Sequence, residues 1–130
     1  MKRRSNIRNE RGQTMVEFVL VLPVLLVVLF GIIQFGLTFN NYIALTDAVR
    51  AGARTAAVSR FATNPTSDTT ARVKNASGDL DPAKVGVTVT STWVHGDDVV
   101  VKATYPYSIS LLGVVVASGN LSSTTTERVE

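Results

Sequence analysis

The sequence predicts an α+β protein in which one long N-terminal helix continues into a small domain with an antiparallel sheet of three to four strands. Two observations support this class: an apolar run of helix length follows a basic N-terminal segment, and apolar residues alternate with polar ones in the C-terminal third. We expect a basic leader in residues 1–12, the helix in residues 13–60 and the small α+β domain in residues 61–130. The length of 130 residues leaves no room for a second, catalytic domain.

The formal charge of +3 is concentrated in the leader. Residues 1–12 carry five Lys or Arg and one Glu, a net charge of +4, whereas residues 40–130 carry eight basic and eight acidic side chains. The small domain is therefore neutral, and its composition provides no basic face for nucleic acid. The chain has no cysteine, which excludes disulfides and thiolate metal sites.

Residues 18–39 form an apolar run of twenty-two residues in which only Gln34 and Thr38 are polar. At about 1.5 Å per residue, a helix of this length spans the roughly 30 Å hydrocarbon core of a bilayer. We therefore expect a transmembrane helix. The basic leader precedes the run and no comparable cluster follows it, so the positive-inside rule places residues 1–12 in the cytoplasm and exports residues 40–130.

Two simpler interpretations of this run remain to be weighed. A cleaved secretory signal peptide needs a small-x-small site close behind the apolar run, and the nearest one, residues 51–53, lies far beyond Phe39. An uncut signal anchor explains hydropathy and orientation but gives no role to Glu17. A carboxylate at membrane depth costs up to about 3 kcal/mol, and less near the interface. The alternative that Glu17 lies at the interface without a function therefore remains open.

Residues 11–18, Arg-Gly-Gln-Thr-Met-Val-Glu-Phe, resemble the processing site of type IV prepilins. The resemblance lies in a short basic leader, a glycine, four residues, a glutamate, an aromatic residue and then a long apolar helix. It implies that a prepilin peptidase cuts between Gly12 and Gln13, which leaves a mature chain of 118 residues. Glu17 is then the fifth mature residue, and Phe18 follows it at the start of the assembly helix.

Three further stretches make the chain similar to TadE-like proteins of tight-adherence pilus systems. They are the run Val-Leu-Pro-Val-Leu-Leu around Pro23, the Ala-Gly-Ala-Arg-Thr-Ala-Ala core of residues 44–58, and the closing Thr-Glu-Arg-Val-Glu. The resemblance implies a pilin-like structural or assembly subunit, usually a minor pseudopilin, in the bacterial cytoplasmic membrane or in a pilus. Its implied partners are the membrane, the prepilin peptidase and other pilins, and it implies neither catalysis nor a cofactor.

The implied cut also creates an α-amine on Gln13. This amine has a reference pKa near 7.7, so it is largely cationic at neutral pH, and a buried cation needs a partner. In the pilin family the glutamate of one subunit meets the amine of another, which implies such a pair between Glu17 and Gln13. A buried pair of this kind fixes register between subunits more than it raises stability. Cyclisation of the N-terminal glutamine would remove the charge and weaken the pair.

Beyond the apolar run, a small residue recurs at every fourth position: Ala44, Ala48, Gly52 and Ala56. This helical period predicts that the membrane helix continues outward to about Ser59. The small residues allow close approach of another helix or packing on the protein's own sheet, and the sequence leaves both open. Pro23 removes one helical hydrogen bond, so a kink or a locally loosened helix is expected near it.

In the small domain, residues 64–68 predict a turn, with Ser67 or Asp68 as the cap of a short helix that ends near Gly78. Two alternating runs follow, and residues 95–98 join them into a β-hairpin. The inward positions are Val85, Val87 and Val89 on the first strand, and Val99, Val101, Ala103 and Tyr105 on the second.

Pro106 is expected to end the second strand of this hairpin. Residues 111–116 are apolar and residues 121–129 are rich in threonine, which predicts a third strand and leaves a fourth open. His95 is the only histidine and lies in the predicted hairpin turn.

Asp79 and Asp81 lack the other ligands of a calcium loop, so we expect them to be solvated turn residues. We therefore expect no catalytic, cofactor or metal site. Two hypotheses remain, a processed filament or assembly subunit and an uncut membrane anchor with a small binding or sensing domain, and the start of the mature chain discriminates between them.

Overall fold

The computed structural model describes the backbone of residues 7–130 and the side chains of residues 12–130. Residues 1–6 of the predicted leader therefore lie outside the described residues, as do the side chains of residues 7–11. Two helices are followed by three strands: α1 (Ile7–Ala57), α2 (Pro65–Asn75), β1 (Gly86–Ser91), β2 (Asp98–Leu111) and β3 (Val114–Arg128). The predicted α+β class is confirmed, with a sheet of three antiparallel strands.

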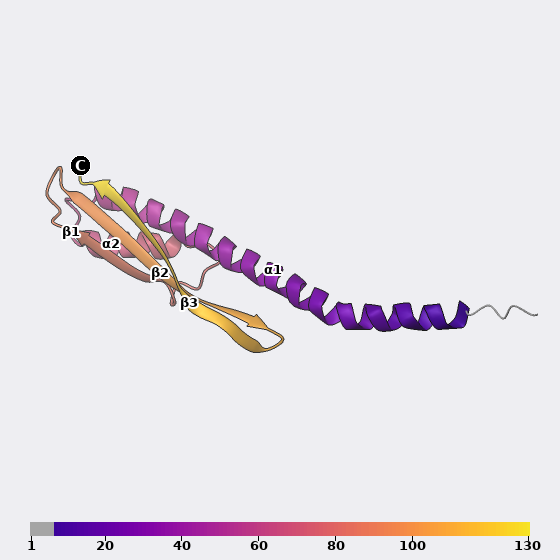
Figure 1. Ribbon diagram of the computed structural model, residues 1–130. Helices are drawn as coiled ribbons and strands as arrows, with labels where there is room; N and C mark the ends of the chain where they lie inside the picture. Colours follow the sequence, from indigo (N-terminus) through magenta and orange to yellow (C-terminus); the bar gives the residue numbers. More distant parts are fainter. Residues whose placement is uncertain (1–6) are drawn as a thin grey trace, which may run out of the picture.

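The helix α1 extends far beyond the small domain, which packs only along its C-terminal half (Figure 1). It begins earlier than the predicted residue 13 and ends at Ala57. In the described part of the chain it is the one helix long and apolar enough to cross a membrane, and none of its most apolar stretch is buried. Pro23 lies inside this helix, and Figure 1 shows a change of direction between the indigo N-terminal part and the violet part that leads to the sheet.

The helix α2 begins at Pro65, so the prediction that Ser67 or Asp68 caps it is wrong. Asn64 is the N-cap residue and makes no side-chain cap hydrogen bond, while Ser67 and Asp68 lie in the first turn. Proline is favoured at the first helical position because its fixed φ suits the helix and its missing N–H would have had no partner there. The helix therefore starts where the sequence was expected to turn.

The sheet has the order β1-β2-β3, with both neighbouring pairs antiparallel. The strand β2 does not end at Pro106, as predicted, but continues to Leu111, with Pro106 opposite Asn120 of β3. Its pairing with β1 stops at Thr104, which lies opposite Gly86. At Pro106, β2 thus has a partner on one side only, and a free edge tolerates a residue without an N–H.

Residues 111–116 do not form a separate strand. Leu111 pairs with Val114, and Leu112 and Gly113 make the two-residue turn that joins β2 to β3. The apolar run is therefore the end of a long hairpin, and the threonine-rich residues that follow it belong to β3. No fourth strand forms among residues 7–130.

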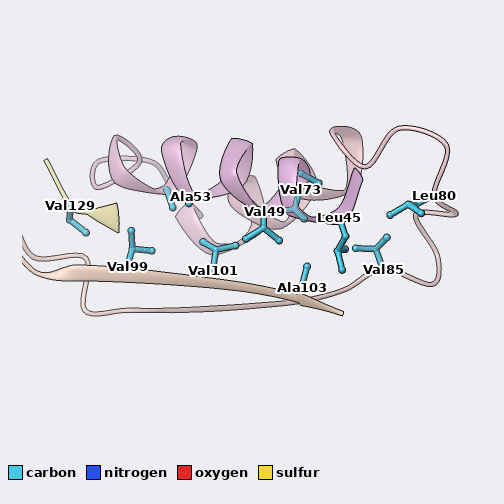
Figure 2. Close-up of a cluster of buried hydrophobic side chains, with 12 residues drawn as sticks. Leu45, Val49, Ala53, Val73, Leu80, Val85, Val99, Val101, Ala103 and Val129 are labelled. Carbon is cyan, nitrogen blue, oxygen red and sulfur yellow. The ribbon is translucent and has the colours of Figure 1, made fainter. Parts of the chain in front are cut away.

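The core lies between one face of the sheet and the two helices (Figure 2). Val99, Val101 and Ala103 alternate along β2 and point toward α1, as the predicted period of two requires. The other buried residues of this core, from the helices and from the loops next to the strands, are Leu45, Ala48, Val49, Ala53, Ala56, Val73, Leu80, Val85 and Val129.

Val129 and Glu130 link the end of the sheet to the β1–β2 loop and to the end of α1. The N–H of Val129 donates to the carbonyl of Asp97 at 2.8 Å, and its carbonyl accepts from Gly96 N at the same distance. Next to it, Glu130 N donates to the carbonyl of Ala57 at 2.9 Å. These bonds hold the β1–β2 loop, the end of β3 and the end of α1 together.

Candidate functional site

The predicted processing and assembly residues all lie on the first described turns of α1. Gln13 Nε2 donates a hydrogen bond of 3.2 Å to Glu17 Oε1, because residues four apart lie on the same face of a helix. Phe18 is exposed next to this pair. Apart from its chain neighbours and the backbone of its own helix, no described group lies within 4 Å of the place where a Cβ on Gly12 would lie, so the surface is open there.

Together these residues form one shallow, open depression on the helix surface. It is lined by Gly12, Gln13, Val16 and Glu17. Its shape follows from the missing side chain of Gly12 and from the one-turn spacing of the others. The peptide bond between Gly12 and Gln13 lies at its edge and, in this structure, inside the continuous helix α1.

Glu17 is the only charged residue among residues 12–46. Its carboxylate accepts a hydrogen bond from the neutral amide of Gln13. The two ion pairs among the described side chains, Arg50–Asp47 and Lys84–Asp81, do not include Glu17. The charge is therefore not neutralised by any described group of its own chain. A carboxylate in this position is suited to a cationic partner from outside.

The surface that follows Glu17 is apolar all round the helix. From Met15 to Phe39 large apolar side chains are exposed on every face, without a core around them. The hydroxyl of Thr38 is satisfied by the helix backbone, because its Oγ1 donates a hydrogen bond of 2.9 Å to the carbonyl of Gln34. A helix that is apolar all round belongs in lipid or in a bundle rather than in water.

The small-residue stripe has a different environment from this exposed half. Ala48, Gly52 and Ala56 are buried in the chain's own core, and Ala44 packs at its edge. A Cβ on Gly52 would collide with Cγ2 of Val73 on α2. The close approach that the small residues allow is thus used within the chain, by α2 and the sheet. Pro23, the remaining predicted packing residue, lies in the exposed half.

The polar residues singled out as alternatives have local roles. His95 is exposed in the turn between β1 and β2. Asp81 Oδ1 accepts a 3.0 Å hydrogen bond from Ala83 N, and its Oδ2 lies 3.8 Å from Lys84 Nζ. Among the described side chains of residues 12–130, no group of three His, Cys, Asp or Glu is placed to hold a metal ion.

One exposed apolar surface was missed from the sequence. Residues 111–116 were interpreted as strand, but they form the end of the β2–β3 hairpin, where Leu112, Val114, Val115 and Val116 are exposed. The available signal was the length of the uncharged segment around them, because residues 103–126 contain no charged side chain.

Comparison with known proteins connects the exposed half of α1 to a family. The family model described as TadE-like protein matches residues 12–54, from the predicted processing glycine to the packed part of α1. This match confirms the resemblance over residues 12–54, and the closing residues 126–130 lie outside it. No curated protein and no solved structure matches the chain.

Proposed function

Because residues 12–54 are a TadE-like segment, we propose that this protein is a pilin-like structural or assembly subunit, a minor pseudopilin, of a Tad-type surface pilus. The helix α1 anchors it in the bacterial cytoplasmic membrane with its N-terminus in the cytoplasm and its small domain exported. A prepilin peptidase cuts between Gly12 and Gln13, and the mature subunit then joins other pilins through α1. No catalytic step is assigned to it.

The observation that carries the proposal is the N-terminal half of α1, an apolar surface without a partner in its own chain. Each large aliphatic or aromatic side chain moved from water into an apolar environment contributes roughly 1.5–3 kcal/mol. Both lipid and neighbouring copies of α1 provide such an environment. The subunit can therefore rest in the membrane and later exchange lipid contacts for helix contacts in the filament.

The charged end of this half gives the assembly a defined register. Glu17 lacks a cationic partner among the described residues, and the proposed cut creates a cation on Gln13, one turn away along the helix. Because the helix neighbours in a bundle are staggered, the carboxylate of one subunit meets the amine of another. A mispaired register leaves both charges unpaired in an apolar environment, which is strongly unfavourable.

The small domain limits this contact to one half of the helix. One face of the C-terminal half of α1 is covered by α2 and the sheet, with Ala48 and Ala56 fully buried, while Asp47, Arg50 and Arg54 are exposed. Only the part of α1 ahead of the domain is exposed all round, so neighbouring subunits can surround it there. The neutral domain remains outside this shared core.

A second function is favoured by one observation, the unbroken passage of α1 through Gly12 and Gln13. A membrane anchor that is never cut, with a small binding or sensing domain, would have such a helix. The two functions differ in the first residue of the mature chain.

The proposal is tested by the mass and the N-terminal sequence of the protein from membranes and from sheared filaments of its native host. We expect a 118-residue chain that begins at Gln13 or at its cyclised form. Gly12→Val should leave the full-length precursor in the membrane, because a side chain then occupies the position before the cut. Gly36→Val is the matched control, since Gly36 also has open space around it but lies away from the cut. A wild-type chain that still begins at Met1 would establish the uncut anchor instead.

A further inference from the structure

The β2–β3 hairpin ends in an apolar segment whose large side chains are exposed and are not covered by any other described element. We call residues 111–117, Leu-Leu-Gly-Val-Val-Val-Ala, the hairpin tip. Leu112 is 75% exposed and Val115 is 60% exposed, and the nearest charged residues along the chain are Lys102 and Glu127. A cluster of this kind on a surface usually marks an interaction site.

The turn of the tip contains a residue that its backbone does not favour. Leu112 has φ 51° and Gly113 has φ 85°, so both central residues of this two-residue turn are in the left-handed region. Turns of this type strongly prefer Asn-Gly or Asp-Gly. A branched apolar side chain at the first position is sterically unfavourable, and its exposure to water adds a second cost. A conflict between local preference and residue type indicates that the leucine serves something other than folding.

The hairpin brings this tip level with the apolar half of α1. Figure 2 shows Leu45 of α1 beside Ala103 of β2. From Ala103 the strand continues for eight residues to Leu111, roughly 26 Å at about 3.3 Å per residue. From Leu45 the apolar run is reached at Phe39, only about 9 Å along the helix. Figure 1 shows that the hairpin extends toward the N-terminal half of α1. The tip therefore extends past the level of Phe39, the end of the apolar run that is nearer the domain.

We propose that the hairpin tip is a second membrane contact, which enters the outer part of the bilayer when α1 crosses it. This inference rests on the membrane insertion of α1 and requires neither the cut after Gly12 nor assembly into a pilus. The partner is the lipid itself, at the boundary between headgroups and acyl chains. The protein is then held at two points, and the domain has a fixed tilt relative to the membrane.

The chemistry of both faces of the tip favours lipid over a protein partner. Val114 and Val115 are neighbours in a strand, so their side chains point to opposite faces, and both are exposed. A second protein chain would cover one face and leave the other in water. Lipid surrounds the tip and suits both faces.

The polar groups of the hairpin limit the depth of insertion. From Tyr105 to the tip, β2 and β3 pair with each other, but the outer edge of each strand has no partner strand. Unpaired backbone groups are excluded from the hydrocarbon core. Only the tip therefore enters. Tyr107, whose ring lies against Gly119 of β3, and Tyr42, just after the apolar run of α1, are placed to lie at the membrane surface, where tyrosine is enriched.

The test uses the absence of cysteine from the chain. Val115→Cys at the tip and Val94→Cys in the β1–β2 loop are each labelled with the same environment-sensitive fluorophore. Val94 is a matched control because it is also an exposed valine, 56% against 60%, but lies between the end of β1 and the start of β2, at the other end of β2 from the tip. The full-length protein is reconstituted at low density into vesicles of phosphatidylcholine and phosphatidylglycerol that contain spin-labelled lipid.

We expect the probe at residue 115 to be quenched by the spin-labelled lipid and to be several-fold less accessible to aqueous iodide than the probe at residue 94. Equal iodide quenching at the two positions would overturn the proposal. Shielding that appears only at high protein density, without quenching by lipid, would identify a second copy as the partner and would also overturn it.

A substitution in the turn separates membrane contact from folding. Leu112→Asn provides the residue that this turn prefers, so the thermal unfolding temperature should be unchanged or higher. The iodide accessibility of the probe at residue 115 should nevertheless rise, because the most exposed apolar side chain of the tip is lost. Val94→Asn should leave that accessibility unchanged. A tip probe that stays equally shielded in Leu112→Asn contradicts the inference.

Discussion

At the scale of single residues, the important group is the carboxylate of Glu17. It is the only charge in residues 12–46. Its hydrogen-bond donor is the neutral amide of Gln13, and no described cation pairs with it. The hydrogen bond holds Glu17 on the same helix face as the proposed new N-terminus. In the monomer the amide of Gln13 thus occupies a carboxylate oxygen for which the amine of a neighbour would compete.

Replacement of Glu17 by alanine separates insertion from assembly. Glu17→Ala makes the helix more apolar, so the amount of protein in the membrane should be unchanged. An unpaired buried amine costs a few kcal/mol, and each 1.4 kcal/mol is about tenfold, so incorporation into filaments should fall by about two orders of magnitude. The measurement compares subunit in sheared filaments and in membranes of a strain that lacks the native copy.

The control for this substitution is Gln34→Ala, which removes a polar side chain elsewhere in the same apolar half. It should leave piliation unchanged. If Glu17→Ala also assembles normally, Glu17 is an idle interfacial glutamate and the proposed pair does not exist.

At the scale of elements, the contact between α1 and α2 determines where the small domain sits on the long helix. Gly52 allows Val73 to lie directly against the backbone of α1. Gly52→Ala should destabilise the domain by about 1–3 kcal/mol, because the added methyl group overpacks this contact. Thermal unfolding of the full-length protein in detergent, followed through the near-UV circular dichroism of Trp93, measures the effect.

A double-mutant cycle identifies the contact that is responsible. Val73→Ala alone should also destabilise by leaving a cavity, but in combination with Gly52→Ala the total loss should be smaller than the sum. Gly31→Ala is the control, since nothing lies within 4 Å of the added Cβ and alanine favours the helix. Additive losses would show that Gly52 and Val73 are not coupled.

The elements that were predicted correctly are those with a strong local pattern. The apolar run and the four-residue spacing of small residues predicted one long helix, and the alternation at Val99, Val101 and Ala103 predicted the inner face of β2. Helical spacing alone also places Gln13 and Glu17 on one face, because they are four residues apart. Local spacing thus predicted the elements that carry the candidate site.

The errors arose where the outcome depends on neighbours distant in sequence. Pro106 is compatible with β2 because the pairing of β2 with β1 stops at Thr104, which no local pattern shows. The leucine in the turn after Leu111 conflicts with the usual turn chemistry, so the hairpin end was interpreted as strand. Pro65 was assigned to a turn although proline also begins helices, and tertiary packing of Val73 selects the helix.

At the scale of the whole molecule, an apolar rod and a neutral domain lie end to end (Figure 1). The net charge of +4 in the leader predicts that the domain is exported. Trypsin added to intact spheroplasts should therefore digest the domain, which has cleavable residues from Arg50 onward, and spare residues 18–39. Immunoblotting against the domain measures the digestion. Protection in intact spheroplasts with digestion after lysis would show the opposite orientation.

The continuity of α1 through Gly12 and Gln13 has a kinetic consequence for maturation. Inside a helix the carbonyl before the proposed cut accepts a hydrogen bond from the N–H four residues on, so this bond must open before a peptidase can take up the backbone in extended form. Cleavage of a transiently opened segment follows the population of the open form. Glycine raises that population, since it favours the helix by about 1 kcal/mol less than alanine, roughly a fivefold difference. The rate of the proposed cut would then depend on how readily the first turns of the helix unwind, and Gly12 would contribute through its backbone as well as through its missing side chain.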